Sequence, residues 1–234
     1  MNNIDEILNN CENVINYKFK NKSHLLEAIT HRTYANESKK NMKYNQRLEF
    51  LGDSVLSLII SNYLFKKYSN SKEGQLSKIK SSLVSQKSLA DISRELRLGD
   101  FLLLGHGEEA LGGRYRDNML EDLFEAIVGA IYFDSDINNA NKFVMMAFKN
   151  RLDNLDIDNF NNDYKTIFQE LIQKKYKTSP IYKSFEDSNI FKSEVYVNDK
   201  NFAIGFGKSK KEAETNAAKN ALDKIENISR NIKK

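Results

Sequence analysis

Two pairs of carboxylates stand at helical spacing in this chain. Glu49 and Asp53 lie within the segment RLEFLGDSVLSLII, and Asp122 and Glu125 lie within a second apolar segment. On a helix of about 100° per residue, the members of the first pair are roughly 40° apart and those of the second roughly 60° apart. Each pair therefore shares one side of its helix, where like charges repel each other.

The first pair lies on a stripe that also carries Leu56 and Ile60. We therefore expect its helix to be apolar nearly all round and buried, with the carboxylates away from an ordinary solvated face. Burying each charge costs several kcal/mol unless protonation, a basic partner or a metal ion offsets it. A structural salt bridge from Arg47 or Arg116 and a metal ion are both compatible with the spacing alone.

The second pair, considered by itself, favours a solvated acidic face that includes Glu121, because the apolar residues cluster on the opposite side of the helix. The combination of the two pairs favours another interpretation. If their helices cross, four carboxylates form one cluster that cannot stay ionised and packed without cations. Mg²⁺ is the expected ion, because it prefers carboxylates and keeps waters and phosphate oxygens as its remaining ligands. Two such ions can activate a water and stabilise the leaving oxygen of a phosphodiester.

Composition excludes several other classes of site. With one cysteine and three histidines in 234 residues, the chain can form no internal disulfide, and a Cys/His zinc site is not expected. None of the histidines is assigned to catalysis. The sequence has no unbroken apolar run of about 18 residues, so we expect no membrane span. Its polar start, MNNIDEILNN, is not typical of a secretory signal, and the cysteine usage fits a cytoplasmic protein.

The first 150 residues show the apolar period of helices throughout. Helices are predicted over 48–64, over 76–96 with an interruption, and over 118–133, and glycines mark a loop before the last of these. The segment NRLDNLDIDNFNND, residues 150–163, is rich in Asn and Asp and has no clean period, so we interpret it as a linker.

The pattern changes after this linker. An amphipathic helix is predicted over 165–176, and Pro180 prevents its continuation. Three short strands follow, at 181–186, 191–198 and 201–207. A last helix begins near Ser209, which forms a capping box with Glu212. Its packing face is predicted to consist of Ala213, Ala217, Ala218, Ala221 and Leu222. The order helix, three strands, helix predicts a small α+β domain.

Charge is divided unevenly between the two regions. Residues 163–234 carry 15 Lys and Arg against 10 Asp and Glu, whereas residues 1–162 are nearly neutral. This division supports two domains, of which the second faces a polyanion.

The segments NQRLEFLGDSVL (45–56), EGQLSKIKSSLVSQKSLA (73–90) and GGRYRDNMLEDLFEAIVGAIYFD (112–134) resemble, in order, the motifs of the ribonuclease III family. The resemblance extends over residues 15–226. It implies an all-α endonuclease domain at 1–150, a linker at 151–162 and an α-β-β-β-α double-stranded RNA-binding domain at 163–229.

The resemblance also implies the activity. Members of this family hydrolyse double-stranded RNA with Mg²⁺ and leave 5′-phosphate and 3′-hydroxyl ends with short 3′ overhangs. They act as homodimers, so that the expected partners are double-stranded RNA and a second copy, with no membrane and no small-molecule cofactor. Processing of ribosomal RNA precursors and structured mRNAs is the expected role. Phe50 matches an aromatic that inserts into the partner subunit; without the resemblance it would be interpreted as a core residue.

The family's site positions correspond to particular acids of this chain. Asp53 and Glu125 match the catalytic positions, and Glu49, Asp122 and Glu125 match the metal ligands. Glu73 matches an accessory acid that faces the RNA. Loss of one of the four core acids would favour the alternative, a non-catalytic double-stranded RNA-binding protein on the same fold, but all four are present.

The C-terminal region resembles a double-stranded RNA-binding domain. Such domains contact minor-groove 2′-hydroxyls and span the intervening phosphates. The matching positions are polar residues of the first helix and lysines at the start of the last helix, where phosphates are favoured by charge and helix dipole. They are Thr166, Gln169 and Glu170, and Lys208, Lys210 and Lys211. Taken alone, the lysines would instead be interpreted as a solvated cluster.

The chain departs from the family pattern at three places. Gln46 stands where the family usually has Glu. The loss of this acid is expected to affect the rate of cleavage or the release of product. Glu121 stands where a small residue commonly precedes the catalytic Asp. The loop EDSNI, 186–190, is shorter than the family's Gly-Pro-x-His stretch, so one minor-groove contact is expected to be weakened or replaced.

Overall fold

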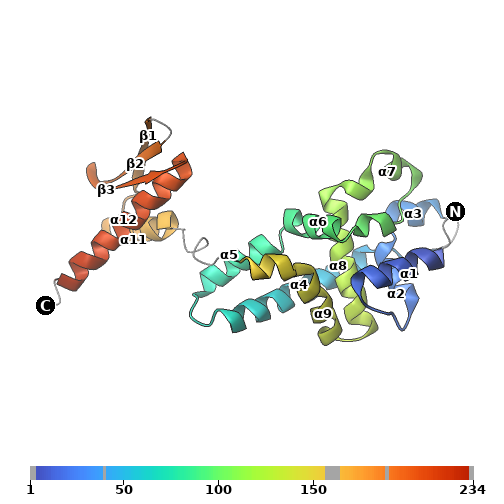
Figure 1. Ribbon diagram of the computed structural model, residues 1–234. Coiled ribbons are helices and arrows are strands. Elements are labelled where there is room, and N and C mark those ends of the chain that lie inside the picture. Colours follow the sequence, from blue (N-terminus) through green and yellow to red (C-terminus); the bar gives the residue numbers. More distant parts are fainter. Residues whose placement is uncertain (1–3, 39–40, 156–163, 188–189, 232–234) are drawn as a thin grey trace. The chain divides into compact units, whose positions relative to one another are not determined.

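The computed structural model describes residues 4–38, 41–155, 164–187 and 190–231 (Figure 1). The chain divides into two compact units, Met1–Leu155 and Asp156–Lys234. Most of the expected linker, residues 156–162, lies outside the described residues.

The first unit is helical, apart from one parallel bridge between Thr30 and Leu103. This confirms the predicted all-α class. Its elements are α1 (Ile4–Ile15), α2 (Lys22–Ile29), α3 (Arg32–Glu37), α4 (Gln46–Lys67), α5 (Glu73–Leu83), α6 (Gln86–Glu95), η1 (Leu98–Phe101), α7 (His106–Ala110), η2 (Gly113–Tyr115), α8 (Asp117–Asp134) and α9 (Ile137–Asp153).

Helix α8 forms the centre of this unit and packs against α2, α4, α6 and α9 (Figure 1). Its middle is buried on all sides because apolar residues occupy nearly every position from Leu123 to Ile131. The interrupted helix predicted at 76–96 is the pair α5 and α6, separated where Ser85 caps the start of α6. The glycine-marked loop contains two short helical turns, α7 and η2.

Helix α9 continues past the expected start of the linker at residue 151. Leu152 is buried, and the guanidinium of Arg151 forms an ion pair with Glu95 of α6. These contacts hold the last turn of α9 on the first unit, so the linker begins later than predicted.

Helix α4 is the one described helix that is long and apolar enough to cross a membrane, judged by length and composition alone. It packs against α8 as a core helix of this unit. Its burial is less complete than predicted, because Phe50, Leu58 and Phe65 are 78%, 60% and 72% exposed. The prediction that α4 is buried nearly all round is therefore wrong for the side of the helix that carries these three residues.

The second unit has the predicted order: α11 (Tyr164–Tyr176), β1 (Ile181–Asp187), β2 (Ile190–Val197), β3 (Lys200–Gly207) and α12 (Lys210–Asn231). The strands form an antiparallel sheet in the order β1-β2-β3. Both helices pack on one face of it, around a core of Phe168, Ile172, Val195, Val197, Ala217, Ala218 and Ala221.

Two local predictions in this unit change in detail. The Oγ of Ser209 accepts the N–H of Glu212, as predicted, but the Glu212 carboxylate accepts the N–H of Lys208 and not that of Ser209. The loop predicted at 186–190 is shorter in the structure, because Glu186 and Ile190 already belong to the paired strands β1 and β2. Residues 188–189 of that loop lie outside the described residues.

Candidate active site and RNA interface

The crossing of α4 and α8 is set by two glycines. A Cβ on Gly52 would lie 1.8 Å from the carbonyl oxygen of Glu125, and one on Gly129 would lie 2.2 Å from that of Leu48. The two helix backbones are therefore in direct contact, and no side chain fits between them. Both glycines lie within one turn of an acid of their own helix, so the crossing brings the acidic faces of α4 and α8 together.

The charges on the two helices act on each other. Burial, followed by the charges of Glu49 and Glu121, raises the pKa of Asp122 to about 7. Burial, followed by the charges of Asp53 and three further acids, raises the pKa of Glu125 to about 8. The structure thus places both predicted acid pairs in one electrostatically coupled cluster. Asp53 is exposed, whereas the other members are half-buried.

Glu121 is a fifth carboxylate of this cluster. Burial raises its pKa, as does the charge of Asp53, while a side-chain hydrogen bond with Gln86 of α6 opposes the shift. Burial and the charge of Glu121 in turn raise the pKa of Glu49. The interpretation of the α8 acids as a solvated face is therefore wrong, because Glu121, Asp122 and Glu125 are all half-buried.

The two arginines considered as structural partners lie elsewhere. Arg116 forms an ion pair with Glu108 at 2.8 Å and donates to the carbonyl of Leu111. Arg47 is exposed. Within the described ranges, neither arginine pairs with any of the five acids. The cluster thus has no arginine to offset its charge there, which leaves protonation or a cation.

The donor set suits a hard cation. It consists of carboxylate oxygens, the ligands that Mg²⁺ prefers, and a cation between them would relieve the repulsion that raises their pKa values. In the described part of the chain, no three Asp, Glu, His or Cys side chains are already arranged around a single ion position. The residues that could hold the ion are Glu49, Asp122 and Glu125, with Asp53 on the exposed side.

The accessory acid Glu73 is not among the charges that act on this cluster. It begins α5, where its Oε1 accepts the hydroxyl of Ser77 at 2.8 Å. It also lines a groove of about 570 Å³ between α4 and α5, together with Leu58 and Phe65. Phe50 points away from the core, so its interpretation as an ordinary core residue is wrong.

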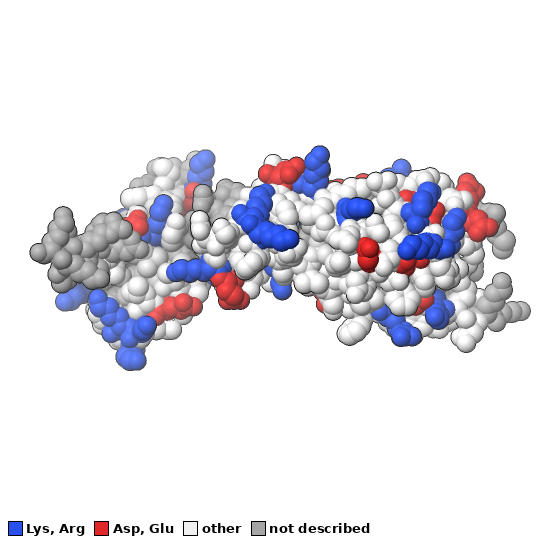
Figure 2. Space-filling model, turned by 90° about the horizontal axis from the view of Figure 1, so that it is seen from below, with Lys and Arg blue, Asp and Glu red and all other residues white. Residues whose placement is uncertain are grey.

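In the second unit, all six predicted RNA contacts are exposed. Thr166, Gln169 and Glu170 share one side of α11. Lys208 directly precedes Ser209, and Lys210 and Lys211 occupy the first turn of α12. On the face drawn in Figure 2, a group of basic side chains lies on the C-terminal unit, at the left of the view.

Three residues that position the site received no role from the sequence. Gly52 and Gly129 set the helix crossing, and Gln86 holds Glu121. The available signal was a glycine in the middle of each strongly apolar helical segment, where glycine costs about 1 kcal/mol relative to alanine and so indicates close packing. Nothing comparable in the sequence marks Gln86.

Comparisons with known families match both units. The Ribonuclease-III-like family model matches residues 21–152, and the double-stranded RNA binding motif matches residues 164–225. Ribonuclease 3 of Borreliella burgdorferi is 46% identical over 215 residues, covering 90% of this chain and 88% of that protein. Ribonuclease 3 of Caldanaerobacter subterraneus subsp. tengcongensis is 42% identical over 224 residues, covering 94% and 98%.

Solved structures match the first unit. The nuclease domain of ribonuclease III from Campylobacter jejuni is 38% identical, with a TM-score of 0.58, and the match covers 67% of this chain and 100% of that domain. A second structure of that domain is 39% identical with a TM-score of 0.56, covering 60% of this chain and 95% of that domain. That second structure is reported to show structural flexibility in the region of the domain that is involved in dimer formation.

Proposed function

Because the chain belongs to the ribonuclease III family, it is an endoribonuclease that acts on double-stranded RNA, and we propose that it does so with Mg²⁺ held by the acids of α4 and α8. The observation that carries this proposal is the backbone contact of α4 with α8 at Gly52 and Glu125, which brings the two acid pairs close enough for the acids of α4 to raise the pKa values of Asp122 and Glu125. The presence of all four core acids favours catalysis over the alternative of a non-catalytic RNA-binding protein.

The chain's own residues divide the work by their exposure. The half-buried carboxylates of Glu49, Asp122 and Glu125 are held by helices in backbone contact, which makes them suited to fixed ligation. Asp53 is exposed, so its carboxylate can accept a proton from a water that attacks the phosphodiester. When bound, Mg²⁺ supplies the positive charge that stabilises the attacking and leaving oxygens. Glu73 is proposed to face the RNA as an accessory acid.

The second unit is proposed to hold the duplex. The exposed polar side chains of α11 fit contacts to minor-groove 2′-hydroxyls. The lysines at the start of α12 fit the phosphates across the intervening groove, where the helix dipole adds to their attraction. None of these contacts reads a base in the major groove, so we propose recognition of duplex shape and not of sequence.

We propose that the active form is a homodimer. Phe50, Leu58 and Phe65 form an exposed apolar stripe along α4, unusual for a lone soluble domain. The similar Campylobacter jejuni domain has a region involved in dimer formation. A second copy covering this stripe would remove it from water and place a second acid cluster on the same duplex.

The remaining features of the proposal follow from the family. The products are proposed to carry 5′-phosphate and 3′-hydroxyl ends with short 3′ overhangs. Ribosomal RNA precursors and structured mRNAs are the proposed substrates, in the cytoplasm. No membrane partner or small-molecule cofactor is proposed.

A long RNA duplex incubated with the protein in Mg²⁺, Ca²⁺ or chelator tests the acid cluster. Wild-type protein is expected to cut only in Mg²⁺. Glu125→Gln is expected to bind the duplex with unchanged affinity and to cut more than about a hundredfold more slowly, since loss of even an outer-shell partner of a metal costs up to that factor.

Glu6→Gln is the matched control, because it makes the same acid-to-amide change on an exposed face of α1. It is expected to cut at the wild-type rate. Equal cutting by Glu125→Gln and wild type would show that the acid cluster is not the active site.

A further inference from the structure

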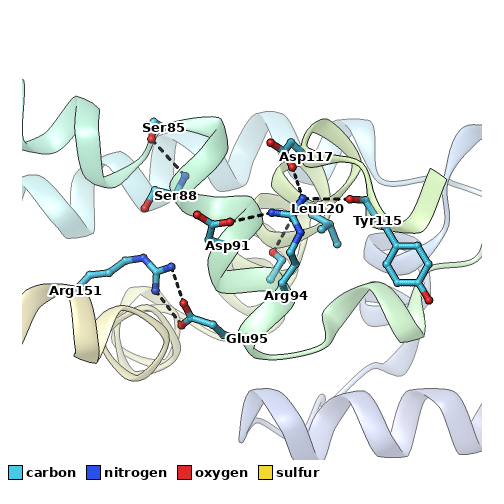
Figure 3. Close-up of polar contacts among 10 residues, drawn as sticks. Ser85, Ser88, Asp91, Arg94, Glu95, Tyr115, Asp117, Leu120 and Arg151 are labelled. Atoms are coloured by element: carbon cyan, nitrogen blue, oxygen red, sulfur yellow. Dashed lines mark hydrogen bonds and ion pairs between the residues drawn. The ribbon is translucent and has the colours of Figure 1, made fainter. Parts of the chain in front are cut away.

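The start of α8 is tied to α6 by one guanidinium. Arg94, in the last turn of α6, donates from Nη1 to Asp91 at 2.9 Å (Figure 3). Its Nη2 donates to the carbonyl oxygen of Tyr115 at 3.1 Å and to the carboxylate of Asp117. Tyr115 ends η2, and Asp117 is the first residue of α8. The guanidinium therefore holds the chain both where it enters α8 and at the first residue of the helix.

Two further polar contacts connect the same helices. The hydroxyl of the fully buried Ser93 donates to the carbonyl oxygen of Leu120 at 2.8 Å. At the other end of α6, the side chain of Gln86 acts on the Glu121 carboxyl group and opposes the rise of its pKa. These contacts lie directly before Asp122, so α6 holds the part of α8 that leads into the acid cluster.

Small movements of this part of α8 would change the site. Asp122 and Glu125 follow Asp117 by five and eight residues, which is roughly 7.5 and 12 Å along the axis. A rotation or slide of the first turn moves both carboxylates relative to Glu49 on α4. Metal ligation tolerates distance errors of only about 0.2 Å.

The pair of Arg94 and Asp117 contributes little to overall stability. Their side chains are 40% and 49% exposed, and exposed ion pairs are weak because water screens them. If this ion pair served only to stabilise the fold, its removal would therefore change the free energy of unfolding very little. The guanidinium group instead fixes the orientation of the start of α8 relative to α6, because its planar donors reach several acceptors in fixed geometry.

We propose that Arg94 is a positioning residue of the acid cluster, which acts through the first turn of α8 to align Asp122 and Glu125 with the acids of α4. The proposal rests on the proposed function of that cluster. Arg94 itself touches neither the acids of α4 nor the expected ion position.

Titration of RNA-free protein with Mg²⁺, followed by calorimetry, tests this role without turnover. Arg94→Ala is expected to raise the Mg²⁺ dissociation constant on the order of tenfold, the lower end of what outer contacts of metal sites supply. Arg94→Lys keeps the charge but not the fork, so it is expected to restore only part of the affinity. Duplex RNA binding in chelator is expected to stay at the wild-type level.

Asp117→Asn removes the same contact from the other helix. It is expected to weaken Mg²⁺ binding as Arg94→Ala does, and the double variant is expected to be no worse than either single one, because the two residues act as one unit. Asp117→Asn and Arg94→Lys also decide the question if Arg94→Ala does not fold.

Arg151→Ala is the matched control. Arg151 also pairs with α6, through Glu95 at 2.9 and 3.0 Å, but it comes from α9 and not from α8 (Figure 3). It is expected to leave the Mg²⁺ dissociation constant unchanged within about twofold, as for additive distant sites. An equal loss of affinity in Arg151→Ala would overturn the proposal, because any weakening of α6 would then suffice.

The two levels of the proposal fail separately. If Glu125→Gln loses Mg²⁺ affinity and Arg94→Ala does not, the role of Arg94 is wrong and the acid cluster stands. If Glu125→Gln binds Mg²⁺ as wild type does, the cluster is not the metal site, and the role of Arg94 is wrong with it.

Discussion

Gly52 of α4 lies directly against Gly129 of α8. A Cβ placed on either glycine would lie 3.0 Å from the backbone nitrogen of the other, and closer still to a carbonyl oxygen of the facing helix. This contact sets the separation of the two helices that carry the acids. The same contact that holds the core together therefore also sets the distances within the proposed metal site.

Gly52→Ala is expected to destabilise the protein by about 3 kcal/mol or more, the upper end for overpacking, because backbone atoms cannot move aside as a side chain would. It is also expected to weaken Mg²⁺ binding. Chemical denaturation and calorimetry measure the two effects.

Gly107→Ala serves as the control for that substitution, since a Cβ there meets nothing within 4 Å. It is expected to leave Mg²⁺ binding unchanged and to stabilise the protein slightly, by at most about 1 kcal/mol, because Gly107 lies within α7. A Gly52→Ala protein with wild-type stability would contradict the close helix crossing.

The metal-free protein is expected to lose stability as pH rises. The pKa values of Asp122 and Glu125 are raised to about 7 and about 8, from ordinary values of 3.8 and 4.5. A carboxyl group whose pKa is higher in the folded than in the unfolded state stabilises the fold fully below its unfolded pKa. That contribution is lost between about pH 4 and pH 8, as both groups ionise beside the other acids.

Thermal unfolding of wild type and of the double variant Asp122→Asn, Glu125→Gln in chelator measures this loss. The Tm of wild type is expected to fall relative to that of the variant across this window. Mg²⁺ at pH 8 is expected to raise the Tm of wild type only. A Tm difference that stays constant from pH 5 to pH 9 would be inconsistent with the raised pKa values.

Phe50→Ala is expected to shift the protein from dimer towards monomer, because Phe50 is exposed and its stripe is the surface proposed to be covered by a second copy. Light scattering over a range of concentrations measures the dissociation constant of the dimer, which is expected to rise on the order of tenfold or more.

Leu111→Ala truncates another apolar residue, 72% exposed, that lies outside the α4 stripe. It is expected to leave the dimer intact. Wild-type protein that is monomeric at micromolar concentration would count against the dimer itself.

RNA binding is expected to depend steeply on salt. Binding is measured with Glu125→Gln protein in chelator, so that the RNA is not cut. The logarithm of the binding constant is expected to fall linearly with the logarithm of the KCl concentration, because the bound phosphates release counterions. Replacing Lys208, Lys210 and Lys211 by Gln is expected to reduce the slope by about one for each lysine that contacts a phosphate.

Gln replacement of three exposed lysines elsewhere provides the comparison: Lys20, Lys66 and Lys149 of the first unit. A much smaller change in slope is expected. Equal changes in the two proteins would indicate a general charge effect and no specific role for the start of α12.

The type of each helix and strand could be predicted, because it depends on the pattern of apolar and polar residues within one segment of the chain. Apolar residues at a period of 3.6 made α4 and α8 recognisable, and alternation with turn residues did so for the three strands. The acid pairs also were visible, since residues three or four apart must share one side of a helix. The cap of α12 at Ser209 followed from two neighbouring side chains.

What covers each helix could not be predicted in this way. The pattern of α4 is apolar on several sides, and nothing in it distinguishes Leu56, which is fully buried, from Leu58, which is 60% exposed. The partner of Arg116 was equally undetermined, and it proved to be Glu108. Such choices depend on which distant segment packs alongside.

The sequence by itself thus determined the two domains' classes, the two acid pairs and the net positive charge of the second domain, because spacing and charge are properties of neighbouring residues. Only the tertiary structure decided that the pairs meet, that Glu121 joins them, and that α6 holds the first turn of α8. Glu49 and Asp122 are far apart in the chain. Their approach depends on Gly52 and Gly129 allowing two backbones to touch, which is a property of packing and not of either helix alone.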